Sequence, residues 1–177
     1  SSMNLTRTRR SAIALGALAF AAAAHAQGAD KLKVGLMLPY SGTFTALGMA
    51  IENGFRLYVN EQGGKLAARE IEFVKVDDES DPAKATENVN KLIRRDKVDV
   101  IVGTVHSGVA MAMARAAKES NTLLIVPNAG SDAVTGQMCA TNIFRSSFSN
   151  WQSSYGMGTV AATQEKKKTA ITITWKY

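Results

Sequence analysis

The 177-residue sequence contains one cysteine, Cys139, and two histidines. A single cysteine cannot close a disulfide within this chain, so no disulfide framework supports the fold. Only His106 lies beyond residue 26, which excludes a metal site built from a cluster of histidines. We therefore expect no metal ion and no other cofactor.

The motifs of common enzyme sites are also missing. Gly103 and Gly108 have the spacing of a phosphate-binding Walker loop, but Val109 and Ala110 stand where lysine and Ser/Thr are required. His106-Ser107-Gly108 is not a nucleophile elbow, because Val105 stands where that motif requires its first glycine. We predict no catalytic residue and no enzymatic activity in this chain.

Long apolar runs are absent apart from one near the N-terminus. Three arginines, Arg7, Arg9 and Arg10, precede an uncharged stretch at residues 11–24, and Ala24-His25-Ala26 has the small-x-small pattern of a signal peptidase site. The stretch is shorter than the roughly 20 residues that cross a bilayer, which disfavours a membrane anchor. Residues 1–26 are predicted to be a secretory signal peptide.

Excluding this leader changes the charge balance. The chain has 21 Lys and Arg against 15 Asp and Glu, a net charge of +6. Three of the basic residues and none of the acids lie in the leader, which leaves a net charge of +3. This value gives little support to a nucleic-acid partner, and none is expected. The one basic run, Lys166–Lys168, is predicted to be a solvated turn.

From Lys31 onward, short apolar runs alternate with helical patterns. Strands are predicted at residues 32–38, 70–77, 98–102 and 122–126, and helices at 47–62, from Pro82 onward, and at 108–120. Connections of only a few residues imply right-handed crossovers and a parallel sheet covered on both faces. The predicted fold is a doubly wound α/β sheet with flanking helices and the strand order two-one-three-four.

The composition of the sequence changes after Phe144-Arg145. Polar residues 146–149 are predicted to be a boundary, followed by a helical stretch to Gln164 and a strand at 169–175 that opens a second α/β unit. Residues 27–146 then form a first unit, and residues 147–177 a crossover and the start of a second. Because Tyr177 directly follows the strand-like run, we expect the chain to be incomplete.

A ligand of a doubly wound sheet binds beyond the carboxyl ends of the strands, where neighbouring connections leave on opposite faces. The loops predicted to meet there are residues 39–45, 103–108 and 127–131. Ser107 and Gly108 open a helix whose unpaired amides could hold an anion such as a carboxylate, and Ser107 could equally be the helix N-cap. The acidic loop 77–81 could hold a metal ion, but we predict a capped and solvated loop because its strand lies away from this point.

Several motifs, taken together, resemble one known family. They are Val34–Leu38, Ser41-Gly42, Leu47-Gly48, Gly63-Gly64, Asp77-Asp78, Asp81-Pro82, Val102-Gly103, Ser107, and Pro127 leading to Thr135. In order and spacing they resemble the Leu/Ile/Val-binding proteins, the type I periplasmic binding proteins. The resemblance implies a periplasmic receptor that captures a small organic ligand between two lobes for the permease of an ABC importer. Residues 27–146 would be lobe 1, and residues 147–177 the first part of lobe 2.

The resemblance also implies a set of ligand-binding residues. Positions matching Ser107, Asn128 and Gly130 hold the carboxylate and amino group of an amino-acid ligand, and the position matching Leu47 packs on its side chain. The full predicted set is Tyr40, Ser41, Phe44, Leu47, Thr104, His106, Ser107, Asn128, Ala129, Gly130 and Ser131. Gly130 stands where amino-acid binders carry a hydroxyl residue, which favours an aromatic or other organic acid.

Two other functions remain open at this point. The same fold could be the ligand-binding ectodomain of a sensor, which a membrane span further along the protein would reveal. The second is an exported α/β enzyme, which these residues support less well. Its catalytic histidine or nucleophile would have to lie outside these 177 residues.

Overall fold

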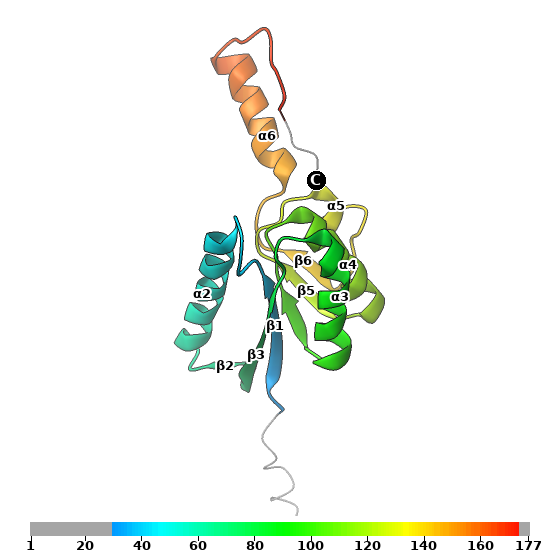
Figure 1. The fold of residues 1–177 in the computed structure, drawn as a ribbon. Helices are drawn as coiled ribbons and strands as arrows, with labels where there is room; N and C mark the ends of the chain where they lie inside the picture. Colours follow the sequence, from blue (N-terminus) through cyan, green and yellow to red (C-terminus); the bar gives the residue numbers. More distant parts are fainter. Residues whose placement is uncertain (1–29, 174–177) are drawn as a thin grey trace, which may run out of the picture. The chain divides into compact units, whose positions relative to one another are not determined.

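The computed structural model describes residues 30–173, and the predicted signal peptide lies outside the described residues. Six strands form one sheet in the order β2-β3-β1-β4-β5-β6 (Figure 1). Their bounds are β1 Leu32–Leu38, β2 Lys65–Leu66, β3 Arg69–Asp77, β4 Val100–Val102, β5 Leu123–Val126 and β6 Ile143–Arg145. All neighbouring pairs are parallel except β2 with β3. The predicted α/β class and the order of the four predicted strands are confirmed.

Helices lie on both faces of this sheet. Their bounds are α2 Thr45–Glu61, α3 Pro82–Asn90, α4 Ser107–Ser120, α5 Asp132–Thr135 and α6 Asn150–Thr159, with single π-helical turns at Lys91–Arg95 (η1) and Val160–Gln164 (η2). In Figure 1, α2 lies against one face, and α3 and α4 cover the other. The connections from β1 and from β4 therefore leave on opposite faces, which makes the gap between these two strands the switch point. No helix among residues 30–173 is long and apolar enough to cross a membrane.

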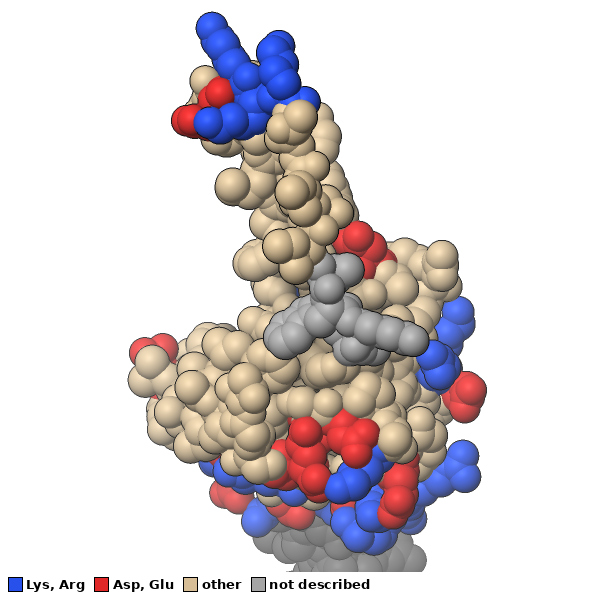
Figure 2. Space-filling view, turned by 45° about the horizontal axis from the view of Figure 1, so that its top comes forward, with Lys and Arg blue, Asp and Glu red and all other residues tan. Residues whose placement is uncertain are grey.

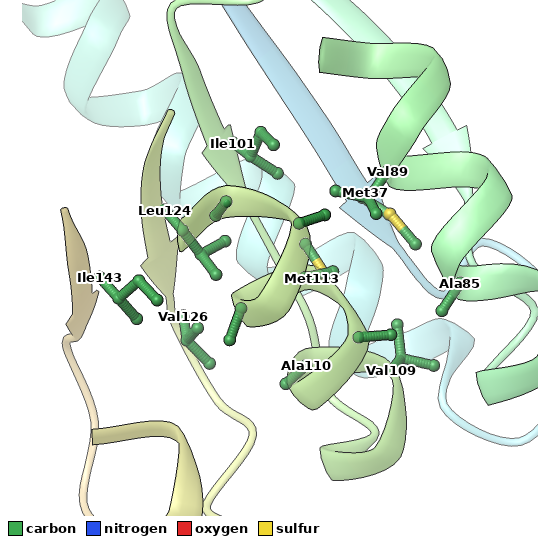
Figure 3. Close-up of a cluster of buried hydrophobic side chains, with 14 of the residues drawn as sticks. Met37, Ala85, Val89, Ile101, Val109, Ala110, Met113, Leu124, Val126 and Ile143 are labelled. Carbon is green, nitrogen blue, oxygen red and sulfur yellow. The ribbon is translucent and has the colours of Figure 1, made fainter. Parts of the chain in front are cut away.

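Strand β1 is buried on both faces because its side chains alternate between two cores. Val34, Leu36 and Leu38 face α2 and pack against Ile51 and Phe55. Met37 faces the other way and joins a larger cluster with α3, α4 and β5, shown in Figure 3. Members labelled there include Val89, Ile101, Val109, Met113 and Leu124. The nearly continuous apolar run in the sequence reflects this two-sided burial.

Two glycines allow backbone segments to approach closely at the carboxyl end of β1. A Cβ atom on Gly103 would collide with the Met37 carbonyl oxygen, and one on Gly48 would collide with the Pro39 carbonyl oxygen. Backbone atoms cannot move aside as a flexible side chain can. These contacts fix how closely α2 and the loop after β4 approach the end of β1.

The C-terminal part differs from the sequence-based expectation in two ways. Residues 143–145 form β6 beside β5, which the sequence analysis did not predict. The strand predicted at 169–175 is wrong for its described residues, because residues 169–173 have no regular structure. These residues pair with none of the six strands described above, and Ile171 and Ile173 are 90% and 93% exposed. A β-prone sequence without a pairing partner does not make a strand.

The close approach at Gly48 gives a stability test within one helix. We expect Gly48→Ala to lower the free energy of unfolding by roughly 1–3 kcal/mol, because the added methyl group meets backbone. Gly54, also in α2, has nothing within 4 Å of an added Cβ. Gly54→Ala should therefore raise the free energy of unfolding by about 0.5–1 kcal/mol through helix propensity. Urea unfolding measures both, and equal effects of the same sign would contradict the packing argument.

Candidate functional site

The loops after β4 and β5 are joined to each other by hydrogen bonds. The Ala129 amide donates to the Thr104 carbonyl oxygen at 3.0 Å. The Ser131 amide donates to the Ser107 hydroxyl oxygen at 3.2 Å. Because β4 and β5 are parallel neighbours, their carboxyl ends bring these loops to one edge of the sheet. The structure thus brings together the predicted site residues of the second and third loops.

Helix α4 is capped by His106 and not by Ser107, so the Ser107 N-cap alternative is wrong. His106 has extended backbone angles, and its Nδ1 accepts from the Gly108 amide at 3.0 Å. Since the ring already satisfies one orphan amide of the helix, the Ser107 hydroxyl is released for another contact. That contact is the Ser131 amide described above.

The Ser107 hydroxyl accepts a hydrogen bond but donates none among the described residues. As the acceptor of the Ser131 amide, it uses an oxygen lone pair and leaves its O–H available. No acceptor for this proton lies among the described residues. A half-buried O–H at the positive end of α4 is suited to donate to an anion.

The predicted site residues differ in their accessibility. Thr104, Ala129 and Gly130 are buried, whereas Ser41, Leu47 and Asn128 are exposed. The remaining five are half-buried: Tyr40, Phe44, His106, Ser107 and Ser131. The three buried residues lie in the interior of the loops, and the other eight are at least partly accessible to solvent.

The third loop is held by two residues that the sequence analysis did not single out. Arg145 donates from Nη1 to the Ser131 carbonyl oxygen at 2.8 Å and from Nη2 to the Thr135 hydroxyl at 3.0 Å. The Asn150 amide, at the start of α6, donates to the Gly130 carbonyl oxygen at 2.8 Å. Both depend on β6 and α6, whose contact with this loop is a tertiary feature that gives no local sequence signal.

The contact between Gly130 and Asn150 also changes the interpretation of Gly130. The sequence analysis treated its lack of a hydroxyl as the loss of a polar contact to the ligand. In the structure, a Cβ atom at Gly130 would collide with the Asn150 side-chain oxygen. The glycine therefore also serves the packing of α6 against the third loop.

The first loop is tied to the α2 face of the sheet through Tyr40. The Tyr40 ring lies 4.3 Å from the Lys75 ammonium nitrogen, and its hydroxyl oxygen is buried. Burial, together with the nearby Glu52 carboxylate, raises the pKa of Tyr40. The Tyr40 side chain is thus fixed between α2 and β3, separate from the contacts that join the other two loops.

Glu52 forms a cluster of charged and aromatic side chains with Arg56, Lys75, Tyr40 and Phe73, called the Glu52 cluster below. Its side chain is 5% exposed and pairs with Arg56 at 2.7 Å and Lys75 at 2.8 Å. Burial alone would raise the pKa of the Glu52 carboxyl, but the hydrogen bonds from Lys75 and Arg56 lower it to about 2. Both cations also lie over aromatic rings, Arg56 at 4.1 Å from the centroid of Phe73.

The acidic loop is only partly the solvated turn that the sequence predicted. Asp81 caps α3 by accepting from the Ala83 amide at 2.8 Å, as expected. Asp78, in contrast, has no exposed surface and accepts a hydrogen bond from the Thr104 hydroxyl. The prediction is therefore wrong for Asp78, because its backbone amide pairs with Leu38 and draws the loop over the end of β1. No group of three potential metal-ligating side chains occurs within residues 30–173.

Two further surface features lie outside this set of loops. A cavity of about 390 Å³ between α4 and α5 is lined by Met111, Arg115, Lys118, Ala133, Gln137 and Met138, none of them a predicted site residue. The three lysines 166–168 are exposed, as predicted, in the turn after η2. Figure 2 shows Lys and Arg side chains gathered at that tip, while much of the surface between it and the sheet carries no charge.

One known protein family and several solved structures are similar to this chain. Residues 31–177 match the model of a family described as periplasmic binding protein. A curated relative, Leu/Ile/Val-binding protein homolog 6 of Brucella abortus (strain 2308), is 33% identical over 158 residues, covering 88% of this chain and 40% of the relative. The chain therefore spans about two fifths of the length of the curated relatives it matches.

Two solved structures are informative about ligands. A solute-binding protein of an ABC transporter from R. palustris, in complex with benzoate, is 57% identical with a TM-score of 0.75, covering 76% of this chain and 38% of that one. A solute-binding protein from Rhodopseudomonas palustris BisB5, in complex with 3,4-dihydroxybenzoic acid, is 34% identical with a TM-score of 0.70, covering 76% and 36%.

The Glu52 cluster predicts a specific dependence of stability on pH. Because the Glu52 pKa is lower in the folded chain than its ordinary value of 4.5, its stabilisation is complete above that value and is lost as the pH falls toward 2. We expect Glu52→Gln to lower the free energy of unfolding by about 1–3 kcal/mol at pH 7, discounted for the partly exposed cations. The mutant should show a shallower loss between pH 5 and pH 2.

Glu61→Gln is the control, since Glu61 is exposed at the end of the same helix and has no ion-pair partner within residues 30–173. Urea unfolding at several pH values measures both variants. Parallel stability curves for Glu52→Gln and the unmodified chain would contradict the ion-pair argument.

Proposed function

The chain belongs to the periplasmic binding protein family, and from this membership we propose that it is the ligand-binding part of a solute receptor for an ABC importer. In this proposal residues 27–146 form lobe 1, and residues 147–177 form the crossover and the start of lobe 2. The receptor works in the periplasm after removal of residues 1–26. It binds and releases its ligand without a chemical step, as the solute-binding role of its relatives supports.

The proposed ligand is a small aromatic carboxylate. One observation carries this choice: the 57% identity to a solute-binding protein in complex with benzoate. The relative in complex with 3,4-dihydroxybenzoic acid supports the same chemical class. Half-buried Phe44 on the first loop and exposed Leu47 in the first turn of α2 offer apolar surface of the kind an aromatic ring requires.

The carboxylate would lie at the start of α4. There the Ser107 O–H lacks an acceptor among the described residues, and the helix dipole favours negative charge. Ser131 and Asn128 follow on the adjoining loop, which the Ser107 contact holds against α4. The chemistry needed is hydrogen-bond donation to an anion beside an apolar wall.

Transport requires that the permease distinguish the loaded receptor from the empty one. A ligand that contacts both lobes stabilises the closed arrangement by its differential affinity for that arrangement. The closed receptor would then be the form that the ABC permease binds. Lobe 1 supplies the anion contact in this scheme, and the second lobe covers the ligand.

Ligand titration of the purified product of the whole reading frame tests the proposed class. We expect benzoate and hydroxybenzoates to bind with micromolar or tighter affinity by isothermal titration calorimetry, and leucine to bind at least tenfold more weakly. Preference for leucine over benzoate would overturn the ligand class. Binding of none of these, nor of other small carboxylates, would overturn the receptor role itself.

Replacing Ser107 tests the proposed anion contact. Ser107→Ala should weaken benzoate binding by roughly 5- to 30-fold, because it removes the hydroxyl donor and leaves the Ser131 amide without its acceptor. Ser120→Ala is the matched control at the opposite end of α4, where the hydroxyl bonds to the helix backbone. Affinity that stays within twofold of the unmodified protein in Ser107→Ala would exclude Ser107 from the site.

A further inference from the structure

Two consecutive carboxylates at the carboxyl end of β3 bond to two different loops of the candidate site. Asp77 Oδ1 accepts from the Tyr40 amide at 2.9 Å and from the Glu79 amide at 2.9 Å. Asp78 Oδ2 accepts from the Thr104 hydroxyl. One carboxylate therefore holds the loop after β1, and the next holds the loop after β4.

The burial of Asp78 makes its role specific. Asp78 and Thr104 both have no exposed surface. A buried carboxylate is costly unless hydrogen bonds replace its hydration, and here the Ser80 amide supplies a second bond, to Oδ1 at 2.8 Å. Burial raises the pKa of the Asp78 carboxyl, an effect that the hydrogen bonds from Thr104 and Ser80 oppose. Each of its oxygens thus has a defined donor, and the carboxylate tolerates little displacement.

The connection continues from Thr104 to the third loop. While its hydroxyl bonds to Asp78, its carbonyl oxygen accepts from the Ala129 amide at 3.0 Å. A shift of Thr104 would therefore move the loop that carries Ala129 and, through it, Gly130. The contact between the acidic loop and Thr104 is therefore made in the interior, beneath the loops of the candidate site.

We propose that Asp78 is a positioning residue of the binding site, setting the spacing of the ligand loops through the Thr104 hydroxyl, with Asp77 anchoring the first loop beside it. The effect on ligand affinity rests on the receptor function proposed above. The effect on the loops themselves does not, and it can be measured without ligand.

The first experiment measures amide hydrogen exchange in the ligand-free product of the whole reading frame. Asp78→Asn removes one of the two acceptors, because the amide nitrogen cannot accept from Thr104 or Ser80. We expect exchange at the Ala129 amide to speed up at least tenfold in Asp78→Asn and in Thr104→Val. The same amide should exchange normally in Thr104→Ser, which keeps the hydroxyl. Unchanged exchange in Asp78→Asn would overturn the proposal, whatever the ligand.

Asp81→Asn is the matched control for the first experiment. It removes a charge from the same loop and keeps a capping side chain for α3. Its Ala129 exchange should match the unmodified protein. An equal increase in Asp81→Asn would assign the effect to general loosening and would overturn the positioning role of Asp78.

The second experiment measures benzoate affinity below the unfolding temperature of each variant. Asp78→Asn and Thr104→Val should each weaken binding five- to fiftyfold, and the double variant should be no weaker than the worse single one, because both act through one contact. Normal affinity in folded single variants would overturn the proposal. If the unmodified protein binds no carboxylate, the receptor function fails, and the exchange experiment still decides whether Asp78 positions the loops.

Discussion

The two-sided burial of β1 is the constraint on which the rest of the molecule depends. Its even-numbered residues from Val34 to Leu38 pack under α2, and Met37 packs under α3 and α4. Because β3 and β4 pair with opposite edges of this strand, the chain must cross it to continue. As a result, the connections after β1 and β4 leave on opposite faces of the sheet. The loops that begin these connections separate at the carboxyl end of β1.

Several polar groups at that end form hydrogen bonds to neighbouring loops. The carboxylates of Asp77 and Asp78, the Thr104 carbonyl oxygen and the Ser107 hydroxyl each bond to a neighbouring loop. Buried polar groups that lack partners would cost several kcal/mol in total, so the bonds favour a single arrangement of the loops. The anion contact proposed at α4 depends on this arrangement being present before a ligand arrives.

Most of the fold could be predicted from the sequence because its signals are local. The apolar run of β1, the Asp81-Pro82 helix start and the short connections each carry a physical cause within a few residues. Strand β6 has only three residues, and its existence depends on β5. The strand predicted at 169–175 failed for the opposite reason. Its residues have a high strand propensity, but no neighbouring strand pairs with the described ones.

The candidate site was predictable as a set of loops, but the roles of its residues were not. The capping by His106 and the burial of Asp78 depend on where rings and carboxylates lie after the sheet has formed. The sequence of an acidic loop does not show whether its carboxylates bond to water or to a buried threonine hydroxyl. The Asn150 contact that restricts Gly130 comes from a helix 20 residues further along the chain.

The residues that set the spacing of the loops differ from the residues that are exposed on the loop surface. Asp78, Thr104 and Ala129 fix where the loops stand, and all three are buried. Side chains on the open side, such as Leu47 and Asn128, can then be exchanged without disturbing the frame. A scaffold arranged in this way can acquire a new ligand by a few surface substitutions, which is how one architecture could come to serve both aromatic acids and aliphatic amino acids.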